Sequence, residues 1–180
     1  MQDEGDTIRR VLGGETEAYR LLVERHERPV FAVIRGLLGR SDGVEDLAQD
    51  VFCSAFEHLG SYDPSRSRFS TWLLTIARNR CLNERARKRP SPTATPPDRA
   101  TDAPPDAALR QAGTAAELDR ALASLPEDQR SAFILVQLAD LTYEQVAASE
   151  DVRVGTVKSR VSRAREKLRA SLARYAGEAP

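Results

Sequence analysis

The chain has 180 residues, enough for one medium domain or two small ones, and its 27 basic residues equal its 27 acidic ones. The total charge therefore indicates neither a nucleic acid nor an anionic membrane as a partner. Evidence on the partner has to come from where the charges lie along the chain. Residues 1–10 lack the apolar core of a signal peptide, and no apolar run approaches the ~18 residues that span a bilayer. Cys53 and Cys81 have neither CxxC spacing nor a nearby His pair, which argues against a disulfide framework or a zinc site. We expect a cytoplasmic protein without membrane insertion.

The first predicted domain, residues 15–89, has apolar residues three and four positions apart, the period of α-helices. One helical face ends near Pro29, and a second continues beyond it to Gly39, which opens a turn. The clearest helix follows at residues 44–59, where the i, i+3, i+4, i+7 pattern is kept for about four turns. Residues 1–14 are left as an N-terminal segment.

The outer face of the predicted helix at residues 44–59 is acidic. At 100° per residue, Asp46, Asp50 and Glu57 fall within about 40° of one another, and Gln49 and Cys53 flank them. Such a stripe is most often only a solvated surface. The functional alternative is a docking surface for a basic helix of a partner protein.

A loop at residues 60–68 and an arginine-rich helix come next. The helix carries a cationic cluster of Arg78, Arg80, Arg85, Arg87, Lys88 and Arg89. Aromatic rings and short polar groups beside such a cluster suit the unstacked bases of single-stranded DNA, where each stacking contributes about 1–3 kcal/mol. Because Phe69 and Trp72 are expected to pack inside, the freer candidates for binding bases are Tyr62, Ser65 and Arg66.

Residues 90–116 are predicted to form a flexible linker. Between residues 90 and 108 this segment has six prolines and hardly any large apolar side chains, so it can neither form nor pack a helix. A Pro-rich chain is semi-extended and keeps two domains apart by a reach of about 3 Å per residue. We therefore expect two separate contacts, one on each side of the linker.

The second predicted domain, residues 117–176, has the order of a helix-turn-helix, and residues 177–180 form a tail. Thr142 and Gln145 fit a capping box at the start of a helix of about two turns. The last helix is basic, and its outward residues near the N-terminal half should read base edges in the major groove: Lys158, Ser159, Ser162 and Arg163. Phosphate contact is expected for Arg160, Arg165, Lys167 and Arg169. For an arbitrary basic helix, a merely solvated charged face is the alternative.

Four stretches together resemble the extracytoplasmic-function sigma factors, in the family's order: EDLAQDVFCSAF, YDPSRSRFSTWLLTIARN, LPEDQRSAFILVQLADLTYEQVA and GTVKSRVSRAREKL. The match covers Glu15 to Arg89 as region 2 and Glu117 to Tyr175 as region 4. The resemblance implies an all-α fold of two small helical domains, a region 2 bundle and a region 4 helix-turn-helix, joined by the Pro-rich linker. It implies an alternative sigma factor that binds core RNA polymerase and directs promoter recognition, DNA melting and transcription initiation.

The resemblance also assigns the surfaces. The acidic face, Asp46, Gln49, Asp50 and Glu57, would contact the clamp helices of the polymerase β′ subunit, and region 4 would meet the β flap. The loop before Phe69 would capture a base flipped from the minus-ten element. The residues assigned to minus-ten DNA are Tyr62, Ser65, Arg66, Arg78, Asn79 and Arg85. Those assigned to the minus-thirty-five duplex are Arg153, Thr156, Lys158, Ser159, Arg160, Ser162, Arg163 and Arg165.

The family expectation includes no cofactor, no metal and no enzymatic activity of the chain itself, since catalysis belongs to the polymerase. A separate anti-sigma factor is a further expected partner. At the turn before the last helix, Glu150 and Asp151 stand where the family usually has Leu-Gly. Asp tolerates a left-handed backbone, but Glu150 at an apolar site is expected to loosen the helix pair or to point outward.

Two other function classes remain as alternatives. A helix-turn-helix regulator that acts without polymerase would need only the last sixty or so residues, and the acidic helix at residues 44–59 argues against it. An enzyme lacks support because His26 and His58 have no Ser, Cys or carboxylate pattern around them that resembles a triad or a metal site.

Overall fold

The structure is a computed structural model that describes residues 3–39, 42–88 and 116–176. These residues form helices and connecting turns without any strand, so the predicted all-α class is confirmed. The linker predicted at residues 90–116 lies outside the described residues except for its last position, and the tail at residues 177–180 lies wholly outside them. Among the described helices, none has the length and apolar character that crossing a membrane requires.

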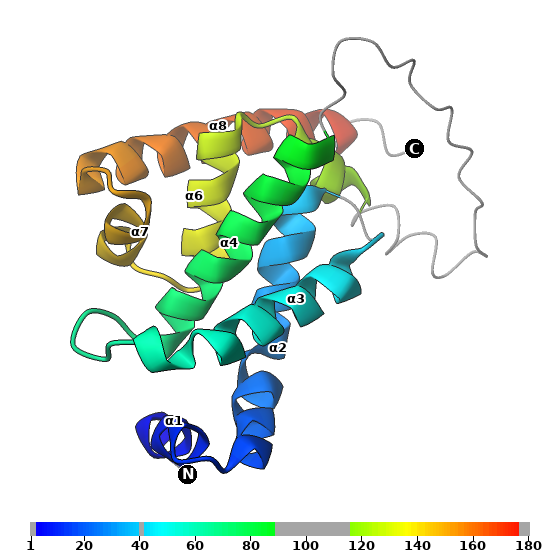
Figure 1. Ribbon diagram of the computed structural model, residues 1–180. Coiled ribbons are helices and arrows are strands. Elements are labelled where there is room, and N and C mark those ends of the chain that lie inside the picture. Colours follow the sequence, from blue (N-terminus) through cyan, green and yellow to red (C-terminus); the bar gives the residue numbers. More distant parts are fainter. Residues whose placement is uncertain (1–2, 40–41, 89–115, 177–180) are drawn as a thin grey trace.

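The N-terminal domain is a bundle of helices built around the long helix α2, Tyr19–Leu38 (Figure 1). Its elements are α1 (Glu4–Leu12), the 3₁₀ turn η1 (Thr16–Ala18), α2 (Tyr19–Leu38), α3 (Val44–Glu57), the 3₁₀ turn η2 (Leu59–Ser61) and α4 (Phe69–Lys88). Helices α2, α3 and α4 pack on one another, because each turns an apolar stripe inward. Their shared core includes Ile34, Val51, Phe69 and Leu73, all essentially inaccessible to water.

The predicted helix end near Pro29 is wrong, since α2 continues through the proline to Leu38. A proline inside a helix costs about 3 kcal/mol. The apolar residues that follow it, Val30, Val33, Ile34 and Leu37, are all fully buried, and this tertiary burial outweighs the local cost. The predicted turn at Gly39 is confirmed, because this residue ends the helix in the left-handed region at φ 65°.

The N-terminal segment contains a helix, α1, that the sequence analysis did not predict. Asp3 caps it by accepting a hydrogen bond from the backbone N–H of Gly5, and Ile8 and Val11 are buried against the bundle. The Glu4 carboxylate lies 2.6 Å from Nε2 of the buried His26. Helix α1 therefore belongs to the first domain rather than preceding it.

The C-terminal domain has a short helix at residues 116–123 followed by α6 (Glu127–Gln137), α7 (Tyr143–Glu150) and α8 (Val154–Ala176). The predicted capping box is confirmed: the Gln145 N–H donates to Oγ1 of Thr142 at 3.2 Å, and the Thr142 N–H donates to Oε1 of Gln145 at 2.8 Å. Asp151 ends α7 at φ 52° and ψ 47°, the left-handed conformation expected of the turn. The order of short helix, turn and longer basic helix is that of a helix-turn-helix.

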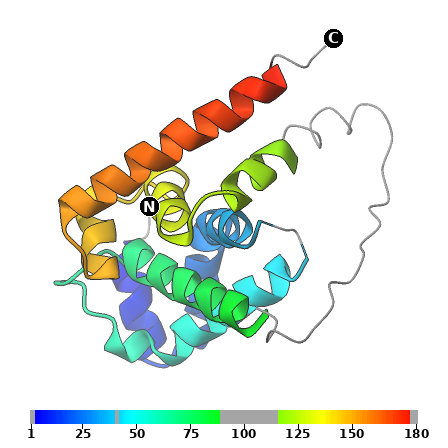
Figure 2. The same cartoon turned by 90° about the horizontal axis from the view of Figure 1, so that it is seen from above.

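The two domains lie against each other rather than apart (Figures 1 and 2). Helix α6 packs on α2, and α7 contacts α4. The approach is closest at Gly36, where an added Cβ would come within 2.9 Å of Cδ1 of Ile134. The expectation that the linker keeps the domains apart does not describe this structure, because a linker of that length permits separation without enforcing it.

Candidate functional site

The acidic face of α3 is exposed as predicted. Asp46, Gln49, Asp50 and Glu57 are all exposed, while the opposite side of the helix, with Leu47, Ala48 and Val51 among its residues, is buried. A charged stripe on one side and a packed core on the other leave these four side chains free to meet a partner.

An apolar groove lies beside the acidic face, between α2 and α3. Its lining includes Tyr19, Val23, Phe52 and Phe56, and Phe56 is 40% exposed, unusual for an aromatic ring. The Tyr19 hydroxyl donates to the Phe52 carbonyl oxygen at 2.7 Å, and burial raises the pKa of this tyrosine well above its usual value. Acidic groups that border an apolar groove form a surface suited to an amphipathic basic helix.

The loop before α4 is held in shape by one aspartate. The backbone N–H and the hydroxyl of Ser65 both donate to Oδ1 of Asp63, at 2.9 and 2.7 Å. These bonds lower the pKa of the Asp63 carboxyl, the hydroxyl of Ser65 having the largest effect. Ser65 and Arg66 are exposed at the tip, where a base could reach them.

Tyr62 anchors the loop to the core and is less free than the sequence analysis expected. Its ring centroid lies 5.5 Å from those of both Phe69 and Trp72, and its hydroxyl donates to the Ser67 carbonyl oxygen at 3.0 Å. Burial raises the pKa of the Tyr62 phenol. Phe69 is buried and Trp72 is half-buried, in agreement with the predicted inner face.

The loop and α4 face the other domain. A cavity between them and α7 is lined on one side by Ser65, Arg66 and Trp72 and on the other by Glu144 and Ser149. Asn79 is exposed, and its Oδ1 accepts a hydrogen bond from Arg78 at 3.3 Å. The Arg85 guanidinium lies 3.8 Å from the Glu127 carboxylate of α6. Arg89 of the predicted cationic cluster lies outside the described residues.

Helix α8 carries exposed basic and polar side chains. Val157, Val161 and Ala164 are buried, whereas Lys158, Ser162, Arg163 and Arg165 are exposed, as is Arg153 just before the helix. Thr156 and Ser159 are half-buried, and the Ser159 hydroxyl donates to the Thr156 carbonyl oxygen at 2.9 Å. Nζ of Lys158 lies 5.9 Å from the centre of the Tyr143 ring, and Arg165 donates to Gln137 of α6 at 2.7 Å. That these residues read duplex DNA stays a prediction.

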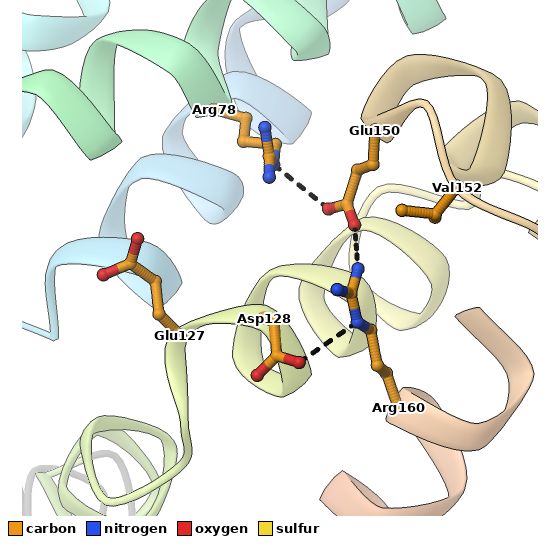
Figure 3. Close-up of a pocket in the computed structure, with 6 residues that line it drawn as sticks. All are labelled: Arg78, Glu127, Asp128, Glu150, Val152 and Arg160. Carbon is orange, nitrogen blue, oxygen red and sulfur yellow. Dashed lines mark hydrogen bonds and ion pairs between the residues drawn. The ribbon is translucent and has the colours of Figure 1, made fainter. Parts of the chain in front are cut away.

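Arg160 of α8 contacts two acidic residues. Its guanidinium donates to Oε2 of Glu150 at 2.8 Å and pairs with Asp128 of α6 at 3.1 Å (Figure 3). In this arrangement the Arg160 side chain faces α6 and α7, and its two acidic partners distinguish it from the other residues assigned to duplex DNA.

Glu150 points inward, so the expectation that it turns to solvent is wrong; that it loosens the helix pair stays a prediction. Its side chain is only 2% exposed. Besides Arg160, its carboxylate lies 3.1 Å from Nε of Arg78 in α4 (Figure 3). It also accepts a hydrogen bond from the Ser131 hydroxyl at 2.9 Å. Arg78 also donates to Oγ of Ser131 at 2.8 Å. The Glu150 carboxylate is tolerated at a position where an apolar residue was expected, because cationic and hydroxyl groups surround it.

Comparisons with known proteins decide the family. A model of sigma-70 region 2 matches residues 22–90, and one of sigma-70 region 4 matches residues 115–168. The ECF RNA polymerase sigma-E factor of Escherichia coli K12 is 34% identical over 173 residues, which cover 89% of this chain and 90% of that protein. The chain belongs to the extracytoplasmic-function sigma factors.

Two other sigma factors are also similar to this chain. The ECF RNA polymerase sigma factor SigE of Mycolicibacterium smegmatis is 35% identical over 162 residues, which cover 87% of this chain but 62% of the longer mycobacterial protein. The sigma factor RpoE of Bartonella quintana, solved in complex with the anti-sigma factor NepR, superposes with a TM-score of 0.66 at 29% identity, covering 86% of this chain and 96% of that one. The N-terminal and C-terminal domains described above are thus regions 2 and 4 of a sigma factor.

Sequence reasoning missed two features of this sigma factor. Helix α1 could have been found from Asp3 and the spacing of Ile8 and Val11, which together form a capped amphipathic turn. The role of Glu150 had no local signal, because its partner Arg78 lies on the other side of the linker. Among the described residues, no cluster of three or more metal-binding side chains is found.

Proposed function

We infer that this chain is an alternative sigma factor that binds core RNA polymerase and directs it to promoters for transcription initiation. The observation that supports this best is the match of both region 2 and region 4, in order, together with relatives that align over nearly their whole length. As a transcription initiation factor of this family, the chain performs no catalysis itself and acts in the cytoplasm, where the polymerase is.

The described surfaces support a division of labour. The acidic face of α3 and the groove beside Phe56 fit the clamp helices of the β′ subunit, because an acidic and apolar surface complements an amphipathic basic helix. Ser65, Arg66, Asn79 and neighbouring arginines engage the single-stranded minus-ten element. The exposed face of α8 reads the minus-thirty-five duplex, and region 4 meets the β flap.

The alternative of a regulator that binds DNA without polymerase is not favoured. Such a protein needs a helix-turn-helix but no region 2, and the region 2 model matches residues 22–90, most of the N-terminal domain here. An anti-sigma factor is a further proposed partner. The relative from Bartonella quintana was solved with an anti-sigma factor bound, and this chain shares the fold that the partner recognises there.

A charge reversal on the acidic face tests polymerase binding. The chain with both Asp46→Lys and Asp50→Lys should bind core RNA polymerase at least about tenfold more weakly, because like charges would meet at the interface. Glu45→Lys is a positional control with one charge reversal instead of two. Glu45 and Asp46 are both exposed acids in the first turn of α3, so replacing either loses the same helix-dipole interaction, but Glu45 lies about 100° away from Asp46.

The measurement is the affinity of fluorescently labelled chain for core polymerase. Weaker binding by the double variant, with near-parent binding by Glu45→Lys, supports the assignment of this face. Equal binding by the parent, the double variant and Glu45→Lys would contradict the assignment of this face to polymerase binding.

A further inference from the structure

Glu150 carries a charge that the two domains neutralise jointly. A buried carboxylate without a partner costs several kcal/mol, so the groups around it decide whether it is tolerated there. Arg160 and Ser131 come from region 4 itself, whereas Arg78 comes from α4 of region 2. With Asp128 also paired to Arg160, two cations face two anions when the domains are in contact.

This arrangement can open. If region 4 moves away, Glu150 keeps Arg160 and Ser131, and water replaces Arg78 at the newly exposed carboxylate. Neither domain is then left with a buried unpaired charge. The cost of separation includes the loss of one shielded ion pair, the hydrogen bond of Arg78 to Ser131 and the packing of α6 on α2 around Gly36 and Ile134. The contact between region 2 and region 4 can therefore form and break reversibly.

Among the residues that the structure describes, two other ion pairs cross between the domains and are weaker. Arg35 lies 3.4 Å from Asp119, and Arg85 lies 3.8 Å from Glu127. In each of these pairs both side chains are partly or largely open to water, whereas the Glu150 carboxylate is almost fully shielded. Exposed pairs contribute little because solvent and salt screen them. Glu150 is therefore the ionic contact expected to matter for the closed arrangement.

In the closed arrangement, groups that are assigned to promoter DNA face the other domain. Arg78, assigned to the minus-ten element, turns toward Glu150 (Figure 3). The loop with Ser65 and Arg66 faces α7 across the shared cavity. We propose that Glu150 is an interdomain latch that holds region 4 against region 2 in the free protein and keeps Arg78 from promoter DNA. The consequence for DNA rests on the proposed function; the latch itself does not.

Distance measurements on the full chain test the latch. One fluorophore of a donor–acceptor pair is attached to the exposed Cys53 in region 2 and the other to Glu166→Cys on the exposed face of α8, while Cys81 is buried. Single-molecule energy transfer then reports how many molecules are closed. The parent should be mainly closed, and Glu150→Gln should raise the open-to-closed ratio about tenfold, the effect of losing a shielded charged partner.

Two further variants make the result specific. Arg78→Gln breaks the latch from region 2 and leaves the contacts of Glu150 within region 4 intact, so it should open the protein even if Glu150→Gln disturbs the helix-turn-helix. Glu127→Gln makes the same charge change as Glu150→Gln at an exposed interdomain pair, and it should alter the ratio less than about twofold. Unchanged transfer in both latch variants, or equal opening by Glu127→Gln, overturns the proposal.

DNA binding connects the latch to the function. With a single-stranded oligonucleotide of mixed sequence, Glu150→Gln should bind several-fold more tightly than Glu127→Gln, since both lose one negative charge but only the first opens the domains and releases Arg78. If Glu150→Gln opens the protein without tightening DNA binding relative to that control, the DNA consequence fails while the latch stands. If the chain supports initiation with core polymerase but the latch variants stay closed, the latch fails while the proposed function stands.

Discussion

Replacing Phe69 with alanine should destabilise region 2 strongly and disturb the loop that is proposed to hold the minus-ten base. The Phe69 ring is 1% exposed and lies at the start of α4, directly after the loop. It contacts the rings of His26, Tyr62 and Trp72 at centroid distances of 5.3, 5.5 and 5.6 Å. Its removal would leave Tyr62, the loop's anchor, without one of its two ring contacts.

The expected loss follows from burial. Deleting a fully buried phenylalanine side chain costs about 3–5 kcal/mol, because the lost apolar transfer free energy adds to the cost of the cavity. Trp72, the only tryptophan of the chain, lies in the same aromatic cluster, so its fluorescence reports the unfolding of region 2. Urea unfolding followed by its fluorescence gives the free energy of unfolding of this domain.

Phe56→Ala is the matched control. It deletes the same side chain from the same domain, but at a ring that is 40% exposed and touches Tyr19 edge-on at 5.0 Å, so a loss of about 1 kcal/mol is expected. If Phe69→Ala lowers the free energy of unfolding by no more than Phe56→Ala does, the aromatic cluster is not the support of the loop and the reasoning is refuted.

Three further outcomes are expected. Thr142→Ala should destabilise α7 by about 1 kcal/mol through loss of the cap, seen as faster hydrogen exchange of its amides, whereas Thr142→Ser should not; equal exchange in both would contradict the capping role. Burial raises the pKa of the Cys81 thiol to about 12, so at pH 8 its thiolate fraction is on the order of 10⁻⁴ and an alkylating reagent should modify the exposed Cys53 first; mass spectrometry showing equal modification would refute this. Arg169→Ala should lower the salt slope of duplex binding by about 0.9, while Arg20→Ala on α2 leaves it unchanged; equal slopes for the parent and Arg169→Ala would remove this arginine from the phosphate contacts.

The features that the sequence predicted correctly have local causes. The stripe of α3 is readable because its apolar residues recur at the helical period, which fixes the buried face and leaves Asp46 and Asp50 outside. The capping box of Thr142 and Gln145 involves groups only three residues apart. Asp151 was acceptable at the turn because its own backbone preference includes the left-handed region.

The features that it did not predict depend on contacts distant along the chain. Pro29 breaks helices locally, but the burial that keeps α2 continuous comes from packing against α3 and α4. Glu150 looks misplaced until α4 brings Arg78 to it, and no periodicity within α7 encodes that partner. The docking of region 4 on region 2 has the same origin, since Gly36 and Ile134 lie on opposite sides of the linker.

Run-off transcription tests the central claim most directly. Core RNA polymerase is combined with this chain on a library of random promoter sequences, and the transcripts are sequenced. The account predicts initiation at defined start sites downstream of a two-part motif at minus thirty-five and minus ten, dependent on the chain. Transcription no greater than that of core enzyme alone would contradict it.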